Sequence, residues 1–149
     1  MSKLSFILKN FHELSTDQLY DCLRLRSEIF VVEQDCVYQD VDDKDQNALH
    51  VLGYSAGELA VYARCFVPGF YFEEAAIGRV LVKAEYRGKG FGHLLMDCAI
   101  KSVYSEFGTD NIRISAQQHL TSFYENHGFY SIGKGYLEDG IPHINMIRQ

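Results

Sequence analysis

Three glycines alternating with single residues could form a binding loop for a phosphate group. They follow an apolar run and come just before an amphipathic pattern. The first turn of a helix carries unpaired N–H groups and a partial positive charge, so it can bind an anion. Glycine lets the backbone approach phosphate oxygens because it has no Cβ. The segment Arg87-Gly88-Lys89-Gly90-Phe91-Gly92 therefore predicts a site for a phosphorylated cofactor.

Two common phosphate-binding motifs do not match this segment. The Walker A loop requires GxxxxGK followed by Ser or Thr, and the sequence contains no such string. The dinucleotide fingerprint requires GxGxxG at the opening of the first βα unit, whereas His93 stands where the last glycine belongs. The glycine segment therefore favours neither a nucleoside triphosphate nor a dinucleotide.

Composition and charge narrow the class of protein. The 149 residues suit a single domain, 1–149, that is long enough to bury a core. A net charge of −6 disfavours a nucleic-acid-binding protein, while the local basic cluster of Lys83, Arg87 and Lys89 suits a small anion. The four cysteines show no metal-ligand spacing, and no apolar run approaches the ~20 residues of a membrane span. We expect a cytoplasmic protein without a metal and without a membrane segment.

Hydrophobic periodicity predicts the elements that position the glycine segment. Ser15 and Gln18 form a capping-box pattern at the start of a helix that ends near Val31-Val32. Leu59, Val61, Ala63 and Cys65 are expected on one face of a strand, and both faces of strand 76–82 are expected to be covered. The expected strands are 4–8, 50–55, 58–66, 76–82, 111–116, 129–137 and 143–148, with further helices over 90–106 and 118–127. This order predicts an α/β protein with a mixed sheet.

Residues 33–47 form a polar and acidic segment with three interpretations. Asp40, Asp42 and Asp45 could be cation ligands, but an EF-hand needs a Gly and a terminal Glu that are not in register here. The segment could also be a rim that attracts cationic amines. We expect the third interpretation, a solvated acidic loop.

Several motifs together resemble the GNAT superfamily of acyl-CoA-dependent N-acetyltransferases. The string Arg87-x-x-Gly90-x-Gly92 resembles its pyrophosphate loop, and Phe123-Tyr124-x-x-x-Gly128-Phe129 resembles its second landmark. Segments 24–34, 38–42 and 138–143 narrow the resemblance to the ElaA-like branch. The resemblance implies a GNAT fold, α/β (α+β), with a mixed central sheet of about seven strands and about four helices. It covers nearly the whole chain.

The resemblance also implies a reaction, the transfer of an acetyl group from acetyl-CoA to an amine. Val80, Leu81 and Val82 would offer backbone groups to pantetheine. Residues 87–92 and His93 would bind the pyrophosphate. The amine acceptor is not identified, and a homodimer through the last hairpin is a further expectation.

Direct attack in a ternary complex needs a base for the amine and a proton for the thiolate. Tyr124 matches the family tyrosine and is the expected acid, because a phenol can protonate a positioned thiolate. The expected base is Glu33, which can also serve as an anchor for the amine, or His143. Arg26 and Arg79 are candidate ion-pair partners of these groups. Two alternatives stay open: a CoA-binding regulatory module without chemistry, and an acyltransferase with a non-amine acceptor.

Overall fold

The computed structural model describes residues 3–149 as seven strands and three α-helices in the expected order. Short helical segments bring the helix content close to the four that the resemblance implies. One of them, the π-helix Ser27–Glu33, continues α1 without a break. The elements are β1 (Ser5–Asn10), α1 (Thr16–Arg26), β2 (Leu49–Ser55), β3 (Glu58–Phe66), β4 (Ala75–Val82), α2 (Phe91–Phe107), β5 (Ile112–Gln117), α3 (Thr121–Glu125), β6 (Tyr130–Glu138) and β7 (Ile141–Arg148).

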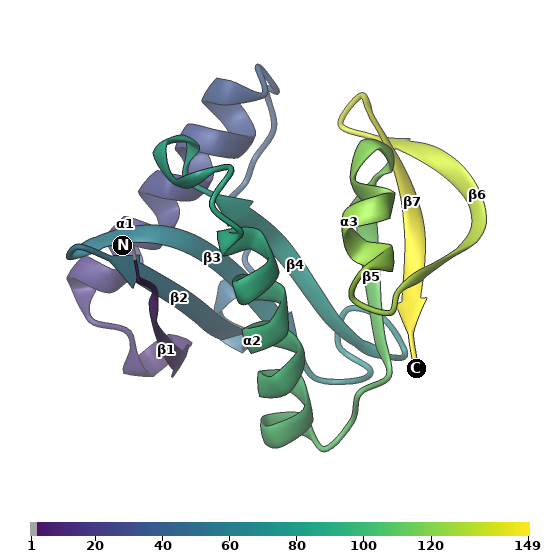
Figure 1. Cartoon of the computed structure of the whole chain (residues 1–149), viewed down its shortest axis with the longest axis horizontal. Coiled ribbons are helices and arrows are strands. Elements are labelled where there is room, and N and C mark those ends of the chain that lie inside the picture. The colour runs from purple at the N-terminus through teal and green to yellow at the C-terminus, as the bar shows by residue number, and fades with distance from the viewer. Residues whose placement is uncertain (1–2) are drawn as a thin grey trace.

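All seven strands form one mixed sheet in the order β1-β2-β3-β4-β5-β7-β6. Only β4 and β5 run parallel, and they pair only where both strands begin, at Ala75 with Ile112 and at Ala76 with Arg113. Beyond these pairs the two strands diverge, which opens the sheet at their carboxyl ends (Figure 1). On the side toward β5, the backbone of the second half of β4 therefore faces a gap, while Leu81 and Val82 pair with β3 on the other side.

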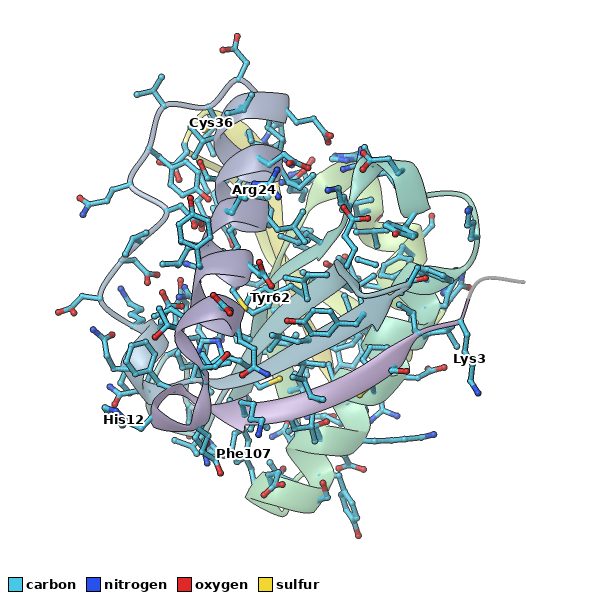
Figure 2. All side chains as sticks on the ribbon, turned by 90° about the vertical axis from the view of Figure 1, so that its left-hand side faces the viewer. Lys3, His12, Arg24, Cys36, Tyr62 and Phe107 are labelled. Carbon is cyan, nitrogen blue, oxygen red and sulfur yellow. The ribbon has the colours of Figure 1, made fainter. Side chains whose placement is uncertain are left out.

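Helices α1 and α2 cover opposite faces of the sheet, because successive side chains of a strand alternate between the faces. Leu95 and Met96 of α2 pack with Val51 and Val61 in the larger core cluster. Cys22, Leu25 and Ile29 pack with Leu52, Tyr62 and Leu81 in a second cluster under α1. Figure 2 views the molecule from the α1 side, with Tyr62 labelled on the strands beside the helix.

The capping box at the start of α1 is confirmed. The Gln18 N–H donates to Ser15 Oγ at 3.0 Å, and the Ser15 N–H donates to Gln18 Oε1 at 2.9 Å. The helical conformation ends at Glu33, close to the predicted end near Val31-Val32, but its last seven residues are π-helical. A π-helical turn is a strained conformation that is frequent near functional sites.

Two predictions about strand faces were wrong. Gly53 pairs with Val61 but Tyr54 pairs with Leu59, so Ala60 is an extra residue that moves Leu59 to the α1 face. In β4, the residues from Gly78 to Val80 are only half-buried, because this part of the strand lines cavities instead of packing against a helix.

The prediction of a solvated acidic loop at 33–47 was also wrong. Asp40 and Asp45 are buried, and both accept hydrogen bonds from the buried Arg26, at 3.0 Å and 2.7 Å. Asp45 also accepts from Arg64 at 2.8 Å, and Asp42 pairs with the same arginine. The segment is acidic because its carboxylates neutralise arginines that the fold buries, which is how proteins accommodate buried charges.

A buried histidine beside this network predicts that stability falls in acid. Burial lowers the pKa of His50, whose Nδ1 lies 2.6 Å from the Tyr62 hydroxyl and whose Nε2 lies 2.9 Å from the Asp45 carbonyl oxygen. Burial opposes ionisation of Asp45, but its hydrogen bonds with Arg26 and Arg64 outweigh burial and lower its pKa. Both groups bind protons more readily when unfolded, so the stability that they contribute is lost as the pH falls.

The contribution of His50 is fully present above the unfolded value of ~6.5 and decreases below it. We expect the free energy of unfolding to fall as the pH drops from about 7 to about 5, with a slope below the ~1.4 kcal/mol per pH unit that uptake of one whole proton would give. Urea titrations across this range measure the slope. The matched variant His50→Gln should remove most of it. A wild-type stability that does not change with pH would contradict the expectation.

Candidate active site

The gap between β4 and β5 holds a cleft that brings together residues from four segments of the chain. We call it the β4–β5 cleft. Its walls come from the π-helix, the second half of β4, the start of α2 and α3. Residues of the predicted site in this lining are Glu33, Val80, Leu81, Val82, Arg87, Gly92 and Tyr124. Five of the ten predicted cofactor residues and two predicted catalytic residues thus share one cleft.

The glycine segment forms a loop that ends at the first turn of α2. Gly88 and Gly90 have φ angles of 78° and 79°, which glycine adopts without strain, and α2 begins at Phe91. The first hydrogen bond of the helix runs from the Leu94 N–H to the Gly90 carbonyl at 3.3 Å. The preceding N–H groups therefore have no partner within the helix and can bind an anion.

Position 92 requires a glycine because α2 and α3 lie very close together there. A Cβ at this position would lie 3.3 Å from the Phe123 ring, so a larger residue would push α3 away from α2. The backbone of the first turn of α2 thereby stays at the edge of the cleft, and the helix packs against the segment that carries Tyr124.

The three basic residues of the predicted anion cluster do not act together. Lys83 is buried and donates to Glu58 at 2.7 Å, on a different side of the loop. Arg87 donates from Nε to the Val82 carbonyl at 3.0 Å and pairs with Glu33 at 2.7 Å, with 45% and 38% of the two side chains exposed. Lys89 is exposed, with its Nζ 5.8 Å from the Tyr86 ring. Arg87 and Lys89 remain available to an anion.

His93 lies beside the β4–β5 cleft rather than in its lining. Its ring stacks on His127, with Nδ1 2.9 Å from Nε2 of that residue, and it also packs against Phe123. The exposed imidazole stands in the first turn of α2, next to the free N–H groups.

A β-bulge in β4 lies at the inner end of the cleft. Tyr62 pairs with Leu81 and Arg64 with Gly78, so β4 has one more residue here than β3. Arg79 takes a φ of 52°, which costs a residue with a side chain about 1–2 kcal/mol. Its guanidinium donates to Asp40 Oδ1 at 2.8 Å and to the Asp40 carbonyl at 3.1 Å. The acidic segment therefore holds the bulge in place.

A second cavity joins the β4–β5 cleft at Tyr124. We call it the hairpin pocket, because the β6–β7 hairpin forms one of its walls. The two cavities share Phe30, Gln34, Val80, Gln117, Leu120 and Tyr124. Further residues of the hairpin pocket are Tyr38, Gly78, Ser115, Glu138 and His143. Tyr124 is thus placed where molecules bound in the two cavities would meet.

Tyr124 is 7% exposed, and burial raises the pKa of its phenol above the ordinary value. The hydroxyl stays protonated at neutral pH for that reason, so it can donate a hydrogen bond or a proton. Among the hydrogen bonds of residues 3–149, none involves this hydroxyl, which leaves it free for a bound molecule.

His143 is buried at the other side of the hairpin pocket, with its orientation fixed by the backbone. Nδ1 lies 2.7 Å from the Ile141 carbonyl, so the proton of a neutral ring is on Nδ1 and the lone pair is on Nε2. Nε2 lies 3.5 Å from Glu138 Oε2. An imidazole with a free Nε2 can accept a proton. The structure thus places His143 and Tyr124 in one pocket, while Glu33 pairs with Arg87 in the cleft.

Our sequence analysis missed three polar residues of the hairpin pocket region. Ser115 hydrogen-bonds to the Tyr136 hydroxyl and lies 3.4 Å from Glu138 Oε1. Tyr136 stacks on His143 at a centroid distance of 6.1 Å. Alternation in β6 could have placed Tyr136 and Glu138 on one face, because residues two apart in a strand share a face, but it gives no signal for Ser115 on β5.

Within residues 3–149, no group of three or more His, Cys, Asp or Glu side chains is arranged to hold a metal ion. None of the helices in that range is long and apolar enough to cross a membrane.

Comparisons with known proteins agree with one another. A family model described as an acetyltransferase (GNAT) domain matches residues 15–149. Protein ElaA of Escherichia coli is 41% identical over 139 residues, covering 92% of this chain and 91% of that protein. Its crystal structure superposes with a TM-score of 0.92, covering 99% of this chain and 100% of that one.

Two further solved structures are similar. An acyl-CoA N-acyltransferase from Pseudomonas aeruginosa is 38% identical, with a TM-score of 0.93 and coverage of 99% of this chain and 100% of that one. An aminoglycoside 6'-N-acetyltransferase complexed with coenzyme A shares the fold at 14% identity and a TM-score of 0.68, with 95% and 96% covered.

Proposed function

The chain belongs to the acetyltransferase (GNAT) domain family, and we propose that it transfers an acetyl group from acetyl-CoA to a primary amine by direct attack in a ternary complex. The observation that carries the proposal is the position of Tyr124, where the β4–β5 cleft and the hairpin pocket meet. One cavity would hold the donor and the other the acceptor, with a protonated phenol at the junction.

The β4–β5 cleft would hold acetyl-CoA. Backbone groups of Val80, Leu81 and Val82 would pair with the pantetheine arm, because within residues 3–149 no strand pairs with the β5 side of β4 beyond Ala76. The free N–H groups of the first turn of α2 would bind the pyrophosphate. Phe91 supplies one of these groups while its ring anchors the helix in the core. The residues proposed for the pyrophosphate are Arg87, Gly88, Lys89, Gly90, Phe91, Gly92 and His93.

The hairpin pocket would hold the acceptor. His143 Nε2 accepts a proton from the ammonium, and the neutral amine nitrogen attacks the thioester carbonyl carbon. A backbone N–H at the bulge in β4 stabilises the oxyanion. The C–N bond is then complete, the C–S bond breaks, and the thiolate of CoA takes a proton from Tyr124. The new amide nitrogen loses its excess proton to the Tyr124 phenolate, which restores the phenol. We propose His143 rather than Glu33 as the base, because Glu33 pairs with Arg87. Glu33 would orient Arg87 toward the cofactor.

The variant Gly90→Glu tests the cofactor site. A Cβ at Gly90 meets no atom within 4 Å, so the fold should persist, but the left-handed backbone is strained and the carboxylate repels the pyrophosphate. We expect calorimetry to show CoA affinity reduced by at least about tenfold. The control is Gly57→Glu in the β2–β3 turn, which has a φ of 78° and equally open surroundings. Equal CoA affinity in wild type and Gly90→Glu would refute the proposed site.

Two finer points complete the proposal. We propose a cytoplasmic location, supported by the four cysteines, which are all free thiols. We also propose a homodimer through the edge strand β6, which has a free hydrogen-bonding side. Sedimentation of the purified protein tests the second point.

A further inference from the structure

A third cavity adjoins the hairpin pocket on the side away from Tyr124. We call it the aromatic pocket, because Phe66, Tyr71 and Phe72 line it. It shares a wall with the hairpin pocket, made of Ile77, Gly78, Arg79, Ser115 and Glu138. A molecule in the hairpin pocket can therefore extend past this wall into the aromatic pocket.

The aromatic pocket offers flat apolar surfaces. The buried Phe66 is stacked by Phe70 and Tyr71 at centroid distances of 5.2 Å and 5.5 Å, and Tyr71 meets Phe72 edge to face at 5.0 Å. Phe70 and Tyr71 remain 41% and 43% exposed. Exposed aromatic rings beside a cavity favour an aromatic or bulky apolar ligand group, since stacked rings gain beyond their buried area.

The charged side chains around the two pockets determine in which pocket the ammonium end of such a ligand lies. Three cations already face the rings: Lys44 Nζ is 6.0 Å from the Tyr71 ring centroid, Arg64 Cζ is 5.1 Å from that of Phe66, and Arg113 Cζ is 4.8 Å from that of Phe72. An ammonium group is therefore disfavoured in the aromatic pocket. At the shared wall, Arg79 is balanced by Asp40 and Asp42, whereas Glu138 presents its carboxylate beside His143. An ammonium is attracted there, next to the proposed base.

Gly78 leaves the passage between the two pockets open. It lines both pockets, and a Cβ at this position would meet no atom within 4 Å. Its backbone conformation is not one reserved for glycine, so a side chain would enter the passage without backbone strain. Gly78 is the residue through which the size of the acceptor can be changed.

We propose that the acceptor is a primary amine carrying an aromatic or bulky apolar group, with the ammonium at Glu138 and His143 and the apolar group in the aromatic pocket. This inference rests on the proposed function, because it names the substrate class of the same site. Glu138 and Tyr71 would then determine which amine is accepted. The reaction is the proposed acetyl transfer, in which the C–N bond forms and the C–S bond breaks.

The test compares kcat/KM for acetyl transfer from acetyl-CoA to 2-phenylethylamine and to n-propylamine. We expect wild type to prefer 2-phenylethylamine by at least about tenfold, because the pocket buries the ring. Gly78→Leu should abolish this preference, because a side chain in the passage lowers kcat/KM for 2-phenylethylamine at least about tenfold more than that for n-propylamine. Tyr71→Ala should reduce the preference, and the exposed Tyr104→Ala on α2 is the matched control. No preference in wild type, or a preference for spermidine over both amines, would overturn the proposal.

A binding measurement separates this inference from the proposed function. In protein saturated with CoA, calorimetry with 2-phenylethylamine should show binding that is lost in Gly78→Leu. If neither amine is acetylated but this binding pattern holds, the proposed function is wrong and the aromatic subsite stands. If acetylation occurs but 2-phenylethylamine binds no better than n-propylamine, the subsite is wrong and the function stands.

Discussion

Tyr124→Phe is expected to lower the rate of acetyl transfer about 100-fold while leaving CoA affinity within about twofold. General acid catalysis typically contributes ~10²–10⁴-fold, and a phenol with a raised pKa is a weak acid, which favours the lower end. CoA affinity should persist because Phe keeps the ring that packs with Phe123 and Phe129. Only the hydroxyl, which has no partner among residues 3–149, is removed.

The rate is measured in single turnovers, with enzyme in excess of acetyl-CoA and with saturating amine, so that product release does not hide a change in the chemical step. Tyr104→Phe on the exposed side of α2 is the matched control and should keep the wild-type rate. A Tyr124→Phe protein that turns over at the wild-type rate would rule out Tyr124 as the acid. A loss of CoA affinity as large as the loss of rate would instead indicate a packing role.

The order of elements could be predicted from the sequence because the patterns are local. Ser15 and Gln18 cap a helix three residues apart, and the glycine segment lies between a strand and a helix that follow it directly. The divergence of β4 and β5 could not be predicted in this way. It depends on pairing that stops after Ala76, far in the chain from its partner Arg113. The resemblance to a family supplied only the expectation that the backbone of Val80, Leu81 and Val82 is available to pantetheine.

The acidic segment shows why local patterns fail for buried charges. Asp40, Asp42 and Asp45 resemble a solvated loop by composition, but their partners lie between 14 and 39 residues away. Whether an aspartate is exposed or neutralises a buried arginine is decided by tertiary packing. The same holds for the hairpin pocket, where Ser115 and Glu138 meet although they lie 23 residues apart. Polar residues that meet across strands carry no spacing signal.

Arg26 is the residue whose loss should destabilise the fold most, because it links two buried carboxylates. Its guanidinium is fully buried and donates to Asp40 and Asp45. Arg26→Met keeps much of the volume but leaves both carboxylates without this partner. Breaking a buried ion pair costs about 3–5 kcal/mol, so we expect a fall of that size in the free energy of unfolding. Urea titration followed by circular dichroism measures it.

The matched control is Arg87→Met, since the Arg87–Glu33 pair is half-exposed and such pairs contribute about 0–1 kcal/mol. If Arg26→Met shows no cooperative transition, Arg79→Met removes another partner of Asp40 at a more exposed position. A loss below about 1 kcal/mol in both network variants would contradict a stabilising role.

The same network connects stability with the proposed chemistry. Asp40 is shared by Arg26, in the buried core of the network, and by Arg79, which has a left-handed backbone at the bulge of β4. Loss of the Arg79–Asp40 contact should therefore let β4 relax toward regular pairing with β3. The bulge now exposes backbone groups at this point. We expect folded Arg79→Met to lose acetyl transfer by about tenfold or more at a temperature where it remains native. CoA affinity should change less, because the pyrophosphate loop lies beyond the bulge. A wild-type rate in folded Arg79→Met would show that the bulge keeps its shape without this contact.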